Sequence, residues 1–440
     1  MPKTREKPSA PARRRVTKAE KQRILRRRRL GVALAVLGFV LFSVVWQANS
    51  PVSASQLAAY GWREEMDFGE MSQLNHLLRK YDITSAPSLT MFFASVGAET
   101  DNGRLTYFED DHVVSNRWFR DVNGTKLGDT PNDILQVNDT LIAIAVNWSN
   151  IIQYIHPDGT ACGATENVPN NRRMCSDGEY LYITSYAHKC GTMRFTKGYV
   201  AKIDVRTKQV VGTCEVGWEP EGIRLYKDTL YIANTGGYSF SETTHEHETT
   251  VSLVDSKSMT FIRNIDTGCI NLFGKVSQAG RYLCINSGGD YYDVKPRMVI
   301  LDCESGQFNV LDFPCTYNTT DGRLFYTVGA EFSYYTGEYK YHLKTIDPIT
   351  MEVTDGVANE VITEKLKTLT SPHEIYISPY TRNIYFTDAG SYASAGYLYG
   401  YTMSGEELFP PQKLYINPAH ILALPIQEQQ AGRRLQVITE

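Results

Sequence analysis

A short strand-like phrase that returns along the chain is the feature that most constrains this 440-residue sequence. Residues 231–240 read "YIANTGGYSF", and similar phrases occur at 283–292 ("LCINSGGDYY"), 325–335 ("FYTVGAEFSYY") and 385–394 ("YFTDAGSYAS"). Each joins alternating apolar residues to a glycine break and then to aromatic or polar residues, which is typical of a β-strand followed by a turn. Recurrence of such a unit indicates a repeat protein.

Each repeat opens with a Pro-x-x-apolar phrase, clearest at Pro131, Pro220, Pro372 and Pro418. A turn and the recurring strand follow, and a third strand often ends in aspartate before a fourth. The period is about 40 to 55 residues, and four strands at this period are typical of one propeller blade.

The incomplete repeats at the two ends of the region predict that the blades close into a ring. Residues 92–119 supply only three strands, and residues 417–424 ("NPAHILAL") supply an opening strand with no successors. The sequence therefore predicts an all-β, seven-bladed β-propeller over residues 88–425, closed by a C-terminal strand that leaves no open sheet edge. Residues 426–440 are predicted to be a tail. The six complete units begin near Pro131, Asn171, Pro220, Asn271, Tyr317 and Pro372.

The N-terminal region predicts membrane targeting. Residues 1–29 are rich in Lys and Arg, and residues 30–46 ("LGVALAVLGFVLFSVVW") carry no charge, as in a basic cytoplasmic tail followed by a transmembrane or signal-anchor helix. Residues 47–87 are predicted to be a spacer with a short amphipathic helix. The alternative is a signal peptide cleaved after Ala54. We expect the propeller on the extracytoplasmic side, either membrane-anchored or secreted and periplasmic.

Charge and cysteine content narrow the range of partners. The net charge is -4 although the N-terminus is basic, so the remainder is acidic and nucleic acid is not an expected partner. All eight cysteines follow the apolar segment, and none forms a CxxC pair, which disfavours zinc. Disulfides and buried free thiols both remain open. We expect a monomeric propeller.

Three stretches carry a resemblance to a known family. They are residues 371–408 ("SPHEIYISPYTRNIYFTDAGSYASAGYLYGYTMSGEEL"), 416–424 ("INPAHILAL") and 128–155 ("GDTPNDILQVNDTLIAIAVNWSNIIQYI"). Together they resemble the YVTN/YncE-like seven-bladed β-propellers, in particular the surface-layer-type branch exported by gut bacteria. That branch includes corrinoid-binding surface propellers, so the resemblance implies a corrinoid as a candidate ligand. No cysteine stands directly after the apolar segment, so a lipid anchor is not implied.

The opening phrases also predict a ligand site. In a propeller they begin the innermost strands, so the residues after each proline should surround the mouth of the central channel. The loops after the second strands should open on the same face and bring aromatic side chains. Fixed polar groups beside aromatic rings suit a small polar ligand that contains a ring. The candidate binding residues are Asn132, Asp133, Trp148, Arg172, Arg173, Tyr186, Glu221, Tyr238, Tyr292, Tyr335, His373, Glu374, Tyr392 and His420.

Three alternative functions follow from the same residues. His373, Glu374 and His420 come from adjacent blades and could support the general acid–base chemistry of a propeller hydrolase or lyase. His245 and His247 in "THEHET" are candidate metal ligands, with a polar loop as the alternative. The third alternative is a protein-interaction scaffold of the cell envelope. A propeller supports all of these, so the fold alone does not choose between them.

Overall fold

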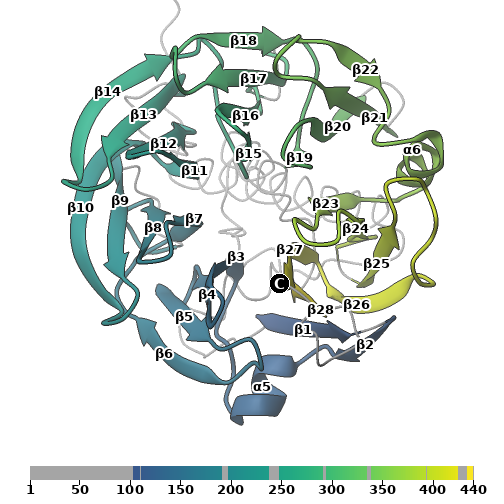
Figure 1. Ribbon diagram of the computed structural model, residues 1–440, viewed down its shortest axis with the longest axis horizontal. Helices are drawn as coiled ribbons and strands as arrows, with labels where there is room; N and C mark the ends of the chain where they lie inside the picture. Colours follow the sequence, from purple (N-terminus) through teal and green to yellow (C-terminus); the bar gives the residue numbers. More distant parts are fainter. Residues whose placement is uncertain are drawn as a thin grey trace, which may run out of the picture.

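The computed structural model is an all-β ring that defines a β-propeller (Figure 1). It describes residues 103–109, 111–190, 197–236, 247–290, 294–333, 338–392, 394–424 and 434–439. The strands of this described part form seven antiparallel sheets of four strands. In six of these sheets the first strand in the chain lies nearest the channel, and in the seventh β27 does. The propeller predicted from the repeats is thus confirmed as a fold class. The predicted N-terminal tail, apolar helix and spacer lie outside the described residues.

The strands of the first three complete sheets run outward in chain order. They are β3 (Pro131–Asn138), β4 (Leu141–Val146), β5 (Ile151–Ile155) and β6 (Ala161–Thr165); β7 (Asn171–Ser176), β8 (Tyr180–Ser185), β9 (Lys197–Asp204) and β10 (Gln209–Trp218); and β11 (Pro220–Tyr226), β12 (Thr229–Asn234), β13 (Thr250–Asp255) and β14 (Thr260–Asp266).

The next three sheets have the same order. Their strands are β15 (Ser277–Ala279), β16 (Tyr282–Ser287), β17 (Arg297–Asp302) and β18 (Phe308–Leu311); β19 (Tyr317–Thr320), β20 (Phe325–Ser333), β21 (Glu338–Ile346) and β22 (Val353–Asp355); and β23 (Pro372–Ile377), β24 (Ile384–Asp388), β25 (Ala395–Tyr401) and β26 (Gln412–Ile416). Two short helices, α5 (Trp118–Asn123) and α6 (Glu360–Lys367), lie at the periphery (Figure 1).

The remaining sheet joins the two ends of the described chain. From the channel outward it contains β27 (Pro418–Leu424), β28 (Arg434–Thr439), β1 (Arg104–Glu109) and β2 (His112–Ser115). β28 pairs with β1 on one side and with β27 on the other. The C-terminal region therefore contributes two strands where the sequence predicted one, and residues 434–439, predicted as part of a tail, are the link that closes the sheet. Residues 92–102, the first part of the segment predicted to supply three strands, lie outside the described residues.

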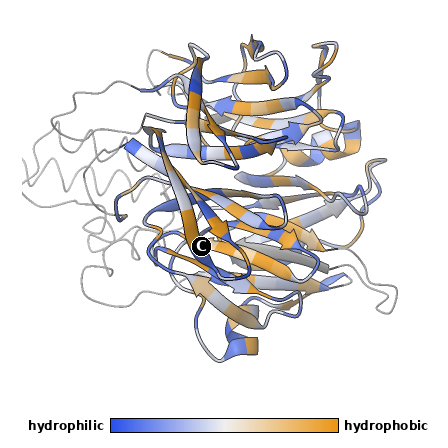
Figure 2. Cartoon of the chain, turned by 60° about the vertical axis from the view of Figure 1, so that its left-hand side comes forward, coloured by the Kyte–Doolittle hydropathy of each residue, from blue (hydrophilic) through white to orange (hydrophobic). Residues whose placement is uncertain are grey.

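Apolar side chains between neighbouring sheets form the core. One cluster joins Ala143 and Ile152 of the first complete sheet to Leu181 and Ile183 of the next, and all four are fully buried. Figure 2 shows hydrophobic residues along the strands and hydrophilic residues in many of the turns. Each buried large aliphatic side chain stabilises the fold by about 1.5 to 3 kcal/mol. Because the clusters span two sheets, each sheet is held by its neighbours.

The aspartates that end the third strands form a repeated turn. The carboxylates of Asp204, Asp255, Asp302 and Asp347 each accept a hydrogen bond from the backbone N–H two residues later, at 2.8 to 3.1 Å. Such Asx turns replace a backbone partner at a tight reversal. The repeated aspartate noted in the sequence is therefore explained by the turn between the third and fourth strands.

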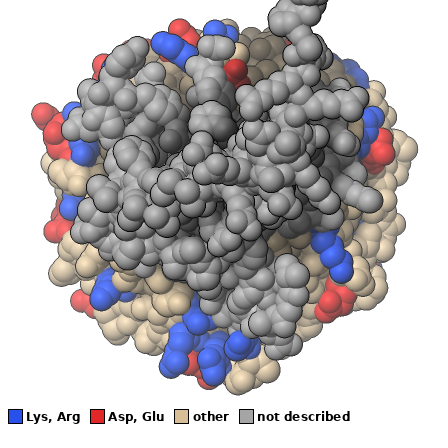
Figure 3. All heavy atoms as spheres, turned by 180° about the vertical axis from the view of Figure 1, so that it is seen from behind, with Lys and Arg blue, Asp and Glu red and all other residues tan. Residues whose placement is uncertain are grey.

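All eight cysteines lie within the described residues, and they are free thiols, six of them buried. Of the two alternatives that the sequence left open, the structure therefore favours free thiols rather than disulfides. No helix of the described part has the length and apolar character needed to cross a membrane. On the face seen in Figure 3, the visible acidic and basic side chains lie around the rim with both signs present. Exposed pairs such as Lys227 with Glu304, at 2.9 Å, contribute little to stability.

Candidate functional site in the central channel

The innermost strands begin with an irregularity that directs side chains into the channel. The register with the second strand shifts after the first or second residue of β3, β7, β11, β23 and β27. Such bulges re-aim neighbouring side chains. At the third position of four of these strands stand Asp133, Arg173, Glu374 and His420, all of them predicted site residues.

These four side chains and that of Lys275 form a series of polar contacts across the channel. We call the five residues the channel ring (Asp133, Arg173, Lys275, Glu374 and His420). Arg173 Nη1 lies 4.0 Å from Asp133 Oδ1 and 3.0 Å from His420 Nδ1. Glu374 Oε2 lies 3.6 Å from His420 Nδ1, and Glu374 Oε1 lies 3.3 Å from Lys275 Nζ. Lys275, which precedes β15, was not predicted. The structure thus brings together four predicted residues from four blades.

The charges of the ring are fixed by their neighbours. Burial raises the pKa of Glu374, but Lys275 and His420 outweigh burial and lower it to about 2. Burial lowers the pKa of His420, and the positive charge of Arg173 lowers it further. Near neutral pH, Glu374 is therefore ionised and His420 is neutral. The ring holds two cations and two anions.

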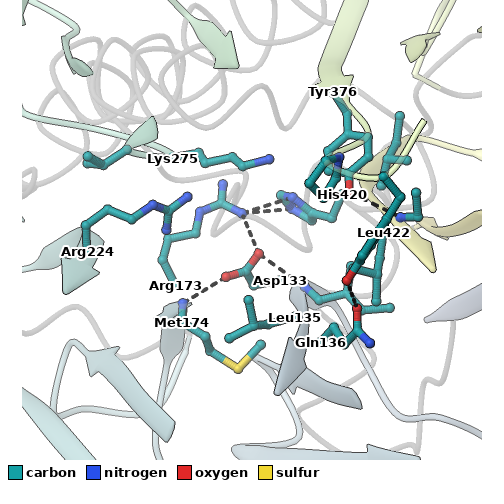
Figure 4. A pocket seen from close by; sticks show the side chains of 16 residues that line it. Asp133, Leu135, Gln136, Arg173, Met174, Arg224, Lys275, Tyr376, His420 and Leu422 are labelled. Atoms are coloured by element: carbon teal, nitrogen blue, oxygen red, sulfur yellow. Dashed lines mark hydrogen bonds and ion pairs between the residues drawn. The ribbon is translucent and has the colours of Figure 1, made fainter. Parts of the chain in front are cut away.

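A cavity of about 270 Å³ adjoins the channel ring (Figure 4). Arg173, Arg224 and Lys275 reach into it from one side, and His420 and Tyr376 face them (Figure 4). The cavity extends along β3 to Gln136 and into the turn after β23, where the Tyr380 hydroxyl donates a 2.7 Å hydrogen bond to Gln136 Oε1. The cavity therefore extends from the face where the inner strands begin toward the face where they end. Its lining comprises Asp133, Ile134, Leu135, Gln136, Arg173, Met174, Arg224, Lys275, Val276, Tyr376, Pro379, Tyr380, His420, Ile421, Leu422 and Ala423.

Arg224 is the cavity residue whose charge is least compensated. It is the fifth residue of β11, and its Nη1 donates a 2.9 Å hydrogen bond to the carbonyl oxygen of Ile223. It makes no ion pair with a carboxylate among the described residues. Burial lowers its pKa and outweighs Cys175 and Asp133, which raise it; the charge of Arg173 lowers it further. The sequence prediction missed Arg224 because it considered only the two residues after each proline. Side chains alternate along a strand, so the fifth residue shares a face with the third and was also a candidate.

A second polar cluster lies beside the ring but outside the cavity lining. Arg172 Nε donates a 2.6 Å hydrogen bond to Glu221 Oε1, which also accepts from the Tyr186 hydroxyl at 2.5 Å. The Arg172 guanidinium lies 4.9 Å from the centroid of the Tyr186 ring. Glu221 is fully buried. We call Arg172, Tyr186 and Glu221 the sealed cluster. Its members were predicted as ligand contacts, and the structure pairs them with one another.

The other described candidates also lie outside the cavity lining. His373 Nδ1 lies 3.0 Å from the Tyr317 hydroxyl, and the His373 ring makes edge contacts with Tyr317 and Tyr392. Burial lowers the pKa of His373 to about 3, helped by the neighbouring His420. Asn132 is buried and donates to the Arg172 carbonyl oxygen at 3.2 Å.

Trp148 is half-buried. Tyr238, Tyr292, Tyr335 and His245 lie outside the described residues. His247 is described and half-buried, and the described part contains no group of three side chains suited to hold a metal ion.

Comparison with known proteins supports the fold. The sequence matches no family model and no curated protein. Hydrazine synthase from Kuenenia stuttgartiensis is similar in structure, with 13% identity, a TM-score of 0.51, and coverage of 69% of this chain and 92% of that chain.

Two further solved structures are similar at a lower level. A quinoprotein alcohol dehydrogenase-like protein from Bacteroides thetaiotaomicron gives a TM-score of 0.48 at 10% identity, covering 77% of each chain. Apo AztD from Citrobacter koseri gives 0.40 at 15% identity, covering 68% of this chain and 76% of that chain. Of these three similarities, that to hydrazine synthase has a TM-score above 0.5, and at 13% identity it concerns the fold alone.

Proposed function

We propose that this β-propeller is a non-enzymatic binding protein that takes a small organic anion into its central cavity. The observation that supports the proposal is the convergence of Arg173, Arg224 and Lys275 on one cavity whose lining contains a single carboxylate, Asp133. Guanidinium and ammonium groups with few anionic partners favour carboxylate or phosphate ligands. The cationic lining contrasts with the acidic balance of the whole chain.

The size of the cavity favours a small ligand. Pockets for small molecules typically enclose roughly 300 to 1,000 Å³, and about 270 Å³ lies near the lower end. A corrinoid, which the sequence resemblance implied, is too large to be enclosed in this cavity. It would have to bind mainly through other surfaces, and the described residues offer no contact that favours it. The proposed ligand is therefore smaller than a corrinoid.

A hydrolase or lyase is the second candidate, and the contact between Glu374 and His420 favours it. The carboxylate can orient the imidazole, as a general base requires. Two observations weigh against it: Arg173 already lies against the His420 ring, and His373 is held by Tyr317 rather than by Glu374. Turnover of ester or lactone substrates that is lost in His420→Asn would support the enzyme and overturn the binding proposal.

Thermal unfolding of the full-length protein tests the binding proposal. Mono- and dicarboxylates, phosphate esters and neutral analogues would be screened for ligand-dependent increases in Tm. We expect stabilisation by at least one anion and its loss in Arg224→Gln. Arg323→Gln is the matched control, because Arg323 is 75% exposed, does not line the cavity, and pairs with Asp347 at 3.8 Å within the described part. Failure of every anion, or equal loss in both variants, would overturn the proposal.

We further propose that the propeller acts outside the cytoplasm, as a member of the exported YVTN/YncE-like group. The repeated phrases and the basic and apolar segments at residues 1–46 support this. The experiment is protease accessibility in intact cells and spheroplasts, with a cytoplasmic protein as control. Protection of the propeller until the cytoplasmic membrane is lysed would contradict export. An envelope protein that co-purifies with Arg224→Gln as well as with the parent would favour the scaffold alternative.

A further inference from the structure

The charge balance around the cavity narrows the class of ligand, an inference that rests on the proposed function. Arg173 and Lys275 each have a nearby carboxylate, Asp133 at 4.0 Å and Glu374 at 3.3 Å respectively. Lys275 Nζ also lies 5.5 Å from the centroid of the Tyr376 ring. These two cations are therefore largely neutralised by the protein, although both still line the cavity.

Arg224 supplies the remaining positive charge. Its one hydrogen bond within the described part joins Nη1 to a neighbouring backbone oxygen, so the rest of the guanidinium edge can accept a ligand. Three cations and two carboxylates leave a single uncompensated positive charge, since His420 is neutral. A buried charge without a partner is unfavourable, and one bound anion removes that cost. A monoanion balances the site, whereas a dianion would leave it with an excess negative charge.

The rest of the lining is largely apolar. Leu135, Met174, Val276, Tyr376 and Leu422 contribute apolar surface to the cavity wall. Met174 is 1% exposed, so it is already fixed within the core. Such a wall favours the body of a hydrophobic or aromatic ligand, because contact with it removes apolar surface from water. A simple inorganic anion would leave this wall without a partner.

We infer that the ligand is a small monocarboxylate with an apolar or aromatic body. Its carboxylate pairs with the Arg224 guanidinium beside Arg173, and its body lies against Leu135 and Tyr376. The planar guanidinium matches a carboxylate through two parallel hydrogen bonds. A phosphate monoester carries about 1.5 to 2 negative charges near neutral pH and is disfavoured by the charge balance.

Four probes of related shape test this inference by calorimetry on the full-length protein. They are phenylacetate, the neutral 2-phenylacetamide, phenyl phosphate, and acetate, which lacks the apolar body. We expect phenylacetate to bind at least tenfold more tightly than each of the other three. Arg224→Gln should raise the Kd of phenylacetate at least tenfold, and Arg323→Gln should leave it unchanged.

The outcomes separate this inference from the proposed function. Equal or tighter binding of the amide or of acetate, or no measurable binding of phenylacetate, would overturn the inference. Tighter binding of phenyl phosphate that depends on Arg224 would also overturn it, but would leave anion binding in the cavity intact. If none of the anions in the wider thermal screen binds, both the inference and the proposed function fail.

Discussion

Arg172 and Arg224 lie on neighbouring inner strands, and their surroundings differ sharply. Arg172 belongs to the sealed cluster, where Glu221 balances its charge and the Tyr186 ring lies 4.9 Å from its guanidinium. Arg224 faces the cavity and makes no ion pair with a described carboxylate. Burial lowers the pKa of Arg172, but Glu221 and Tyr186 outweigh burial and the net pKa is raised; for Arg224 the net shift is downward. The comparison separates a charge that has a buried carboxylate partner from one that has no such partner in the described part of the chain.

The largest effect should come from breaking the sealed cluster. Glu221→Ala leaves the Arg172 charge buried without its main partner, so the free energy of unfolding should fall by about 3 to 5 kcal/mol. Denaturant titration measures the change. The matched control is the double variant Arg172→Met with Glu221→Leu, which removes both charges and should recover most of the loss. Unchanged stability in Glu221→Ala would mean that the cluster is not sealed.

An intermediate effect is expected from acid. The pKa of His373 is about 3 in the folded protein and 6.5 in a model peptide, so the unfolded chain gains a proton below pH 6.5 while the folded protein does not. Stability contributed by neutral His373 is therefore lost as pH falls from about 6.5 toward 3. Between pH 7 and pH 5 the loss should be about 2 kcal/mol smaller in His373→Phe than in the parent. Parallel stability curves for the two proteins would contradict this.

The smallest effect should come from Arg224. Because its charge is uncompensated, Arg224→Met should leave the unliganded protein equally stable or stabilise it by up to about 1 kcal/mol. Arg172→Met, the same change in the sealed cluster, should destabilise it, since Glu221 would remain buried without its cation. Chemical denaturation of both variants without ligand provides the measurement. A large loss in Arg224→Met would remove the distinction between the two arginines.

Much of the fold could be predicted because each repeat contains local sequence signals for the start of a strand and for a turn. Prolines mark the start of several inner strands, and aspartates mark the turns after third strands, so local sequence reports the architecture. β28 was missed because "RLQVIT" has no opening phrase and follows no typical turn. Its role depends on pairing with β1, more than 300 residues earlier, and no local pattern reports such a distant contact.

Part of the site could be predicted because the same opening phrases mark the residues at the start of the inner strands. The opening phrases located Asp133, Arg173, Glu374 and His420, which the structure brings together. They could not tell Arg172 from Arg173, because which of two adjacent side chains faces the cavity depends on the bulge at the start of β7. Lys275 was missed because no proline marks its strand. Arg224 was missed because it lies further along the channel wall.

The closing sheet has a consequence for how the protein is made. Residues 434–439 follow every other described strand in the chain, yet β28 stands between β27 and β1. Translation thus reaches this strand after every other described strand has been synthesised, so the ring closes late. A nascent chain interrupted before residue 434 would expose the backbone edges of both β1 and β27, which invites intermolecular pairing. We therefore expect chaperones to be needed most before β28 becomes available to pair with β1 and β27.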